Sequence, residues 1–178
     1  MNSGLVSTRY ANALLDFAIE LGEQEQVYAR MKLLAHLFFE VPELKEIVQN
    51  PSIPAKEKKK IIVTACGGAL PTSLEKMIGL ILENERENQL QFITQRYIDL
   101  YRRRFRIQAG KLITAVPLEE GTKKRLMEKI HHLIGNTLEI ETVVDPNIIG
   151  GFIFNLDDYR WDASVSGELE RVRQSLKQ

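Results

Sequence analysis

The sequence predicts a mainly α-helical protein with a small α/β part, in which a six-helix bundle precedes a smaller C-terminal α/β domain. The chain has 178 residues, 44% hydrophobic and 27% charged, which is typical of folded globular proteins. Apolar residues follow helical spacing almost throughout as far as Arg106, and short β-branched runs begin beyond it. We therefore predict domains at residues 1–106 and 107–178.

The first three helices of the bundle are each indicated by an apolar stripe or a proline boundary. Apolar residues at helical spacing define the first helix, followed by Gly22 as a stop: Val6, Tyr10, Leu14, Phe17 and Leu21. The same spacing defines the second helix: Val27, Met31, Leu34 and Phe38. Pro42 suits the first turn of a short third helix, and Pro51 ends it because the residue before a proline avoids the α conformation.

The remaining three helices follow in close succession. Pro54 introduces a fourth helix with the sequence AKEKKKIIVTA, which runs into Gly67 and Gly68. Ser73 is expected to cap the fifth helix. The apolar residues of that fifth helix include Leu74, Met77, Ile78 and Ile81. The sixth is defined by Leu90, Ile93, Tyr97 and Tyr101.

The C-terminal part alternates strand and helix signals. Strands are predicted at 112–116, 138–144 and 151–156, and a further strand from Tyr159 to Trp161, after a turn at Asp157-Asp158. A helix is predicted from Gly121 to a stop at Gly135-Asn136. Ser164 is expected to cap a final helix with one apolar stripe: Val165, Leu169, Val172 and Leu176.

Composition excludes several classes of protein. The 24 basic and 24 acidic residues cancel, whereas phosphate contacts require a basic surplus, so general nucleic-acid binding is disfavoured. Cys66 alone excludes an intrachain disulfide framework and suits a small core residue. No apolar run approaches the roughly 18 residues of a membrane span. The N-terminal segment lacks the pattern of a signal or transit peptide.

A search for catalytic, cofactor-binding and metal-binding residues finds no set of them. Gly150 and Gly151 lack the lysine of a phosphate loop and are read as a kink where a strand begins. His131 and His132 are adjacent on a helix, so they cannot share a metal as an i, i+4 pair would. The carboxylates Asp157, Asp158 and Asp162 are read as a turn and a helix start. The basic runs KEKKK and RRRFR are read as solvated helix faces.

Two helices carry more apolar surface than one core face requires. On a helical wheel the apolar arc of the first helix spans about 240° and that of the fifth about 200°, against the roughly 100° that faces a core. Either both helices are buried on two sides, or they leave an apolar groove for a partner helix. Periodicity alone favours neither interpretation.

Six segments spread over nearly the whole chain carry a further signal: RYANALLDFA, NPSIP, LILENERENQL, TAVPL, VDPNIIGGF and DASVSGEL. In their order and spacing, these segments resemble the delta subunit of F-type ATP synthase, the oligomycin-sensitivity-conferring protein family. The resemblance implies a non-enzymatic stator subunit without cofactor or metal. It would link the catalytic head to the peripheral stalk, so that proton-driven rotation is coupled to ATP synthesis.

The resemblance also implies partners and binding residues. The bundle would hold the N-terminal helix of an alpha subunit against its first and fifth helices, and the C-terminal domain would bind the C-terminal end of the stalk b subunit. The expected alpha-binding residues are Tyr10, Ala13, Leu14, Phe17, Met77, Ile78 and Ile81. Gly150 and Gly151 match the family's structural glycine pair. The expected location is the cytoplasmic face of a bacterial inner membrane, with membrane contact only through the complex.

Two other functions remain open from the sequence. A nucleic-acid-binding adaptor could use RRRFR and the α/β domain, although the charge balance opposes it. A small enzyme could use the cluster from Asp157 to Asp162.

Overall fold

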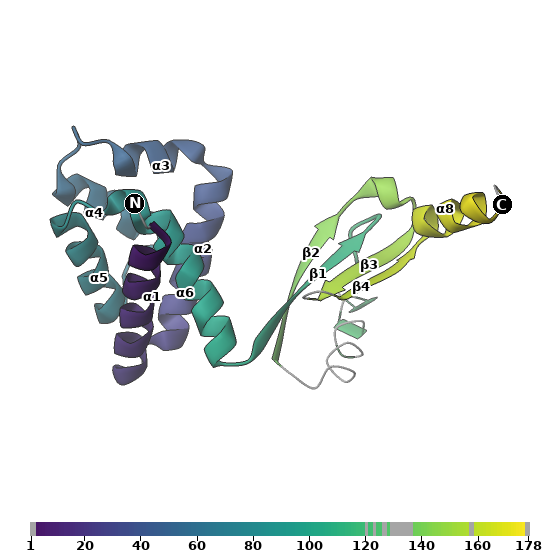
Figure 1. Ribbon diagram of the computed structural model, residues 1–178, viewed down its shortest axis with the longest axis horizontal. Helices are drawn as coiled ribbons and strands as arrows, with labels where there is room; N and C mark the ends of the chain where they lie inside the picture. Colours follow the sequence, from purple (N-terminus) through teal and green to yellow (C-terminus); the bar gives the residue numbers. More distant parts are fainter. Residues whose placement is uncertain are drawn as a thin grey trace. The chain divides into compact units, whose positions relative to one another are not determined.

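The computed structural model describes residues 3–119, 121–122, 124–125, 128, 137–156 and 159–176. The chain divides into two compact units, residues 1–103 and 104–178 (Figure 1). The fold is mainly helical with a small mixed sheet. The predicted helix starting at Gly121, the pair His131-His132 and the turn at Asp157-Asp158 fall wholly or partly outside the described residues.

The first unit is helical. Its α-helices are α1 (Ser3–Glu20), α2 (Gln24–Glu40), α3 (Pro42–Gln49), α4 (Ala55–Ala65), α5 (Thr72–Glu83) and α6 (Leu90–Arg104), and a 3-10 turn, η1 (Glu87–Gln89), precedes α6. Each helix lies where the apolar spacing predicts one. Pro42 occupies the first turn of α3, as expected. The core of this unit is built from every one of these α-helices, and its fully buried residues include Leu14, Leu34, Ile62, Leu74, Ile78, Ile81 and Tyr97.

The prediction that Ser73 caps α5 is wrong. Ser73 lies inside the first turn of that helix, and the residue at the cap position is Pro71, whose side chain makes no capping hydrogen bond. The cap comes instead from Glu23, which directly precedes α2. Its carboxylate accepts hydrogen bonds from the backbone N–H groups of Thr72 and Ser73, at 3.0 and 2.8 Å, and from the Ser73 hydroxyl at 2.6 Å.

A second charged side chain, Arg30 of α2, acts at the end of α4. The Arg30 guanidinium donates to the carbonyl oxygens of Cys66 and Gly67, at 3.1 and 3.3 Å. The anion at the start of α5 and the cation at the end of α4 both match the helix dipoles. Residues 23 and 30 are seven positions apart, about two turns of helix, so α2 holds both ends of the α4–α5 connection.

The KEKKK run departs from its predicted solvated face at one residue. Lys58 is buried, and its ammonium forms an ion pair with the Glu87 carboxylate of η1. This pair joins the middle of α4 to the segment that leads into α6. Removing either partner would leave an unpaired buried charge, which costs far more than a surface pair contributes.

The second unit contains a four-stranded sheet in the order β2-β1-β3-β4. The strands are β1 (Ile107–Thr114), β2 (Thr137–Val144), β3 (Gly151–Leu156) and β4 (Tyr159–Ser164). β1 pairs with β2 in parallel and with β3 in antiparallel, and β3 pairs with β4 in antiparallel. The predicted strand at 112–116 therefore begins five residues earlier and ends at Thr114. One sheet face carries the buried cluster Leu112, Leu138, Phe154 and Leu156.

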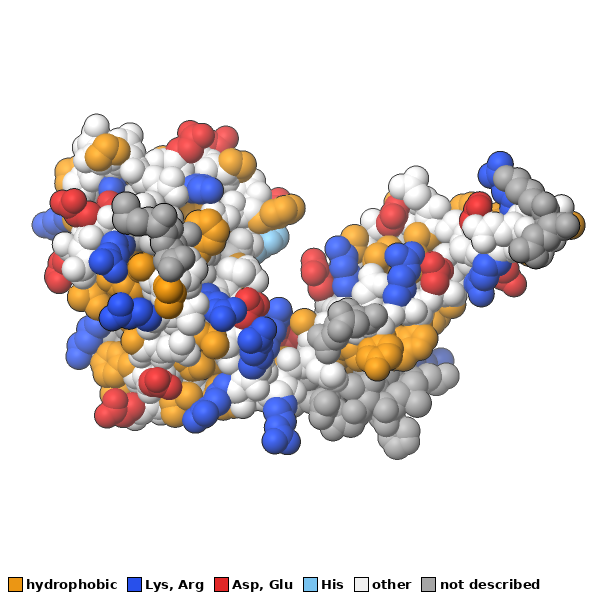
Figure 2. All heavy atoms as spheres, in the orientation of Figure 1, with side chains coloured by type: hydrophobic (Ala, Val, Ile, Leu, Met, Phe, Trp, Pro, Cys, Tyr) orange, Lys and Arg blue, Asp and Glu red, His pale blue; other side chains and the backbone are white. Residues whose placement is uncertain are grey.

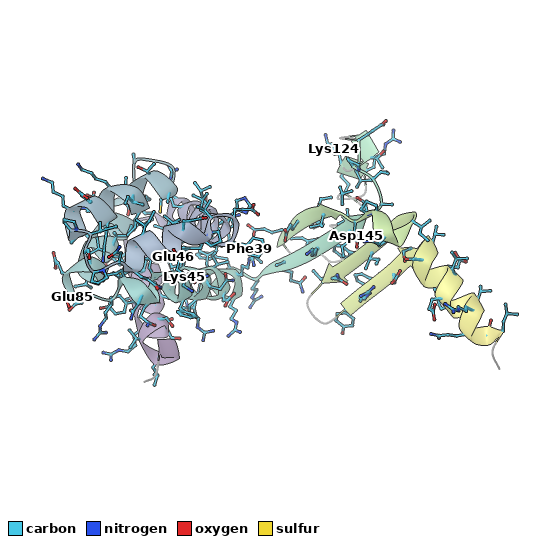
Figure 3. The ribbon with its side chains drawn as sticks, turned by 90° about the horizontal axis from the view of Figure 1, so that it is seen from above. Phe39, Lys45, Glu46, Glu85, Lys124 and Asp145 are labelled. Atoms are coloured by element: carbon cyan, nitrogen blue, oxygen red, sulfur yellow. The ribbon has the colours of Figure 1, made fainter. Side chains whose placement is uncertain are left out.

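The glycine pair lies where β3 begins. A 3-10 turn, η2 (Pro146–Ile148), precedes it, and Asp145 (labelled in Figure 3) accepts a hydrogen bond from the Asn147 backbone at 2.9 Å. Gly151 has φ +73°, and a Cβ atom there would lie 2.1 Å from the Ala163 carbonyl oxygen of β4. The kink predicted at this strand is confirmed, and only glycine fits it.

The helix α8 (Val165–Ser175) completes the second unit. Its predicted cap is confirmed: the Ser164 hydroxyl accepts a hydrogen bond from Gly167 N–H at 3.0 Å. Asp162 in turn accepts hydrogen bonds from the Ser164 hydroxyl and backbone, at 2.5 and 3.0 Å. These bonds, together with Arg160, lower the pKa of the Asp162 carboxyl to about 2. The carboxylate thus orders the start of α8.

We predict that the two glycines differ sharply in their tolerance of a methyl group. Gly151→Ala should destabilise the second unit by more than about 3 kcal/mol, because the new Cβ meets backbone and φ is positive. Gly150→Ala is the matched control. Its Cβ would meet only the exposed Val165 side chain, at 3.1 Å, and no backbone, so the expected loss is below about 1.5 kcal/mol. Urea unfolding of both variants measures the difference, and equal losses would contradict this assignment.

Candidate functional site

A groove of about 440 Å³ lies between α1 and α5, which are neighbours in the first unit (Figure 1). Its lining combines apolar and aromatic side chains with two arginines and an asparagine: Val6, Arg9, Tyr10, Ala13, Met77, Leu80, Asn84 and Arg86. Figure 2 shows hydrophobic side chains on this part of the surface, with basic side chains among them. The groove therefore has an apolar floor, formed by Ala13, Met77 and Leu80, beside the cations Arg9 and Arg86, which we call its cationic rim.

The sequence left open whether the wide apolar arc of α1 is buried in the core or borders a partner groove. In the structure, the arc does both. Ala11, Leu14 and Ala18 are fully buried in the core. Tyr10 and Phe17 are half-buried, and Ala13 is exposed at the groove. One side of the arc thus packs the core and the other faces solvent, because the arc is wider than one packing face.

The arc of α5 divides in the same way. Ile78 and Ile81 are almost completely buried, whereas Leu80 is 46% exposed and lines the groove. Met77 lies between these extremes, with 7% exposure at the groove wall. The larger share of the apolar surface of α5 therefore stabilises the fold.

Six of the seven predicted partner-binding residues fall into two groups. Tyr10, Ala13 and Met77 line the groove, whereas the seventh residue, Phe17, is half-buried and does not line it. Leu14, Ile78 and Ile81 are buried in the core of the free protein, so their part in partner binding stays a prediction. Periodicity could not separate the groups, because both lie on the apolar arcs.

Sequence reasoning missed several groove residues. Val6 and Leu80 were present in the apolar arcs, so their hydrophobicity was visible, but their exposure was not. Arg9, Asn84 and Arg86 carry no apolar signal, and Arg86 follows the end of α5. These residues could be found only from the structure.

Both aromatic rings of this α1 face lie beneath cations. The Arg86 guanidinium lies 5.8 Å from the centre of the Tyr10 ring, and the Lys76 ammonium lies 5.4 Å from the centre of the Phe17 ring. Such contacts contribute roughly 0.5–1 kcal/mol each at exposed sites. The Arg86 contact places a positive charge beside the Tyr10 ring in the groove, whereas Phe17 and Lys76 lie outside the groove lining.

The described residues offer little chemistry for catalysis. Among the described residues, no group of three or more His, Cys, Asp or Glu side chains could hold a metal ion. Cys66 is a buried core residue, as predicted, and burial raises the pKa of its thiol to about 11, which disfavours the reactive thiolate. In the described part of the chain, no helix combines the length and the apolar character needed to cross a bilayer.

We predict that neighbouring leucine and isoleucine residues of α5 respond differently to truncation. Ile81→Ala should destabilise the first unit by about 2–5 kcal/mol, because it opens a cavity in the core. Leu80→Ala should cost less than about 1 kcal/mol, because much of its side chain already meets solvent. Chemical unfolding of both variants provides the comparison. A large loss for Leu80→Ala would show that the groove surface is instead part of the core.

Comparisons with known proteins agree with the resemblance in the sequence. The model of the ATP synthase delta (OSCP) subunit family matches residues 6–176. The chain is 43% identical to ATP synthase subunit delta of Bacteroides thetaiotaomicron, covering 99% of this chain and 96% of the relative. It is 36% identical to ATP synthase subunit delta of Parabacteroides distasonis, covering 99% of this chain and 98% of the relative.

A solved structure supports the fold over the same length. A chain in the mitochondrial ATP synthase hexamer of Toxoplasma gondii superposes with a TM-score of 0.68 at 15% identity, covering 97% of each chain. The match to the family model and the identity to bacterial relatives together show that this chain belongs to the ATP synthase delta (OSCP) subunit family.

Proposed function

We propose that the groove between α1 and α5 binds the N-terminal helix of the ATP synthase alpha subunit. The observation that carries this proposal is the groove itself: an apolar floor containing Ala13, Met77 and Leu80 along two neighbouring helices. A small side chain at Ala13 permits close approach of a helix, and the Tyr10 ring adds apolar area while its hydroxyl can stay in water. A partner helix with an apolar stripe fits this floor.

The general role follows from family membership. The protein is a non-catalytic stator subunit of F-type ATP synthase. Neither the alternative of a nucleic-acid-binding adaptor nor that of a small enzyme finds support in the family match. Within that role, we propose that residues 1–106 form a six-helix bundle that binds the catalytic head, and that residues 107–178 bind the stalk.

A stator subunit has to hold the head while rotation exerts torque on it. Slow dissociation is the main determinant of affinity among related complexes. A docked amphipathic helix, whose apolar contacts run along the full length of a groove, provides such slow dissociation. The cationic rim of Arg9 and Arg86 suits a partner helix with acidic residues beside its apolar stripe.

The proposed stalk contact lies on α8, toward the C-terminal end of a b subunit. None of the described side chains of α8 is buried. The apolar stripe of the helix is therefore exposed along its length: Val165, Leu169, Val172 and Leu176. These residues are spaced four, three and four apart, the spacing with which a helix packs along another helix.

The proposed location follows from these partners. Bacterial relatives of this chain are ATP synthase delta subunits. We place the protein at the cytoplasmic face of the bacterial inner membrane, where it would be peripheral and meet the membrane only through the complex.

We predict that Ala13→Asp weakens binding of a synthetic alpha-subunit N-terminal peptide by roughly 30- to 1000-fold. The bulkier side chain fills the approach, and its charge would be desolvated against an apolar partner. Because Ala13 is exposed in the free protein, the melting temperature should change by only a few degrees. Calorimetric titration and thermal unfolding measure both quantities. Unchanged affinity would contradict the proposed docking site.

We predict that the two partners bind independently to the two halves of the chain. Deleting residues 107–178 should abolish binding of the soluble b-subunit fragment and leave alpha-peptide affinity within about twofold, with circular dichroism confirming that the fragment is folded. In the full chain, Leu169→Asp should weaken b binding roughly tenfold or more. The exposed Gln174→Ala on the same helix is the matched control. A folded fragment that fails to bind the alpha peptide would contradict this division.

A further inference from the structure

The start of α5 lacks a cap of its own. Pro71 precedes the helix and makes no side-chain capping bond. The cap is supplied from about fifty residues away by the Glu23 carboxylate, whose two oxygens accept three hydrogen bonds from Thr72 and Ser73. The hydrogen bonds from Ser73 lower the pKa of the Glu23 carboxyl below its ordinary value of 4.5. The carboxylate is therefore charged at neutral pH, which suits the positive end of the α5 dipole.

The backbone of Glu23 is fixed to the end of α1. Its N–H donates to the Ala18 carbonyl at 2.8 Å, and Gly22 N–H donates to the Ile19 carbonyl at 3.1 Å. Gly22 has φ +69°, which completes the left-handed turn that commonly ends a helix. One residue thus joins the last turn of α1, through its backbone, to the first turn of α5, through its side chain.

This connection acts on the two helices that form the groove. The other end of the groove contains Val6 and Tyr10 of α1 with Asn84 and Arg86 after α5, so the two helices run antiparallel. A fixed distance between the end of α1 and the start of α5 therefore limits both the spacing of the helices and the rotation of α5.

We propose that Glu23 is a positioning residue for partner binding: its carboxylate, held at the start of α5, sets the width of the α1–α5 groove. The inference rests on the proposed docking of the alpha-subunit helix in that groove. Glu23 itself lines a different hollow with Gln26, Arg30 and Pro71, and it does not line the groove, so it acts through α5.

The test compares Glu23→Ala with Glu25→Ala, an exposed glutamate in the first turn of α2. Both variants are made in the full chain. We expect Glu23→Ala to weaken binding of the synthetic alpha-subunit N-terminal peptide roughly five- to thirty-fold, on the scale of a lost helix cap. Glu25→Ala should bind as the unaltered chain does. Equal affinity for all three proteins would overturn the proposal.

A second readout does not depend on the peptide. Spin labels at Asn12→Cys on α1 and Glu83→Cys on α5, in a Cys66→Ser background, report the distance between the helices. Both labelled positions are exposed. The distance distribution should broaden or shift in Glu23→Ala and stay unchanged in Glu25→Ala. If the unaltered chain does not bind the peptide, the proposed function fails, and the label distances still decide the role of Glu23.

A local cap separates positioning from simple helix stabilisation. Pro71→Ser places a capping hydroxyl at the start of α5 without any link to the end of α1. In the double variant with Glu23→Ala, the melting temperature should recover relative to Glu23→Ala alone, while peptide affinity stays low and the distance distribution stays altered. Recovery of affinity together with stability would show that Glu23 only caps the helix, and the proposal would be wrong. Glu23→Gln, which keeps the side-chain shape and an acceptor oxygen, replaces the alanine variant if that variant does not fold.

Discussion

The arrangement of the first unit depends on two charged side chains that reach from the start of α2 to the connection between α4 and α5. Glu23 accepts from the first turn of α5, and Arg30 donates to the last carbonyls of α4. Each charge opposes the partial charge of the helix end that it meets. The connection also contains Gly67, where a Cβ atom would lie 2.6 Å from the Arg30 guanidinium, so the close approach of that cation requires a glycine. Through Glu23 this electrostatic arrangement holds the start of α5, one of the two helices that form the groove.

The sequence predicted the helices well, because each first-unit helix has its own apolar spacing, and prolines and glycines mark several of the boundaries. The prediction from sequence failed where a structural role, such as a helix cap, is performed by a residue far away in the chain. Ser73 has the side chain of a cap, but Glu23, fifty positions earlier, performs that task. β1 begins earlier than expected because Gln108, Ala109 and Gly110 are not strand formers by themselves. Pairing with β2 supplies their regular structure.

At the candidate site, the sequence could predict which residues are apolar but not which of them are buried. A helical wheel reports which residues are apolar, and it identified the two helices that form the groove. It does not report which part of a wide arc the core uses. Ala13 and Leu14 both belong to that arc, about 100° apart, yet Leu14 is fully buried and Ala13 is exposed. The choice is made by the packing of neighbouring helices, which no single-helix pattern contains.

The cations over Tyr10 and Phe17 have a consequence for the protein before it meets any partner. A newly made subunit presents its groove to a crowded solution, where exposed aromatic faces promote self-association. Arg86 and Lys76 shield those faces with groups that remain hydrated and that repel the same surface on another copy. A partner helix with acidic residues would neutralise the positive rim, whereas a second copy would double its charge. The cations on this face therefore oppose the pairing of two such surfaces and favour the docking of an acidic partner helix.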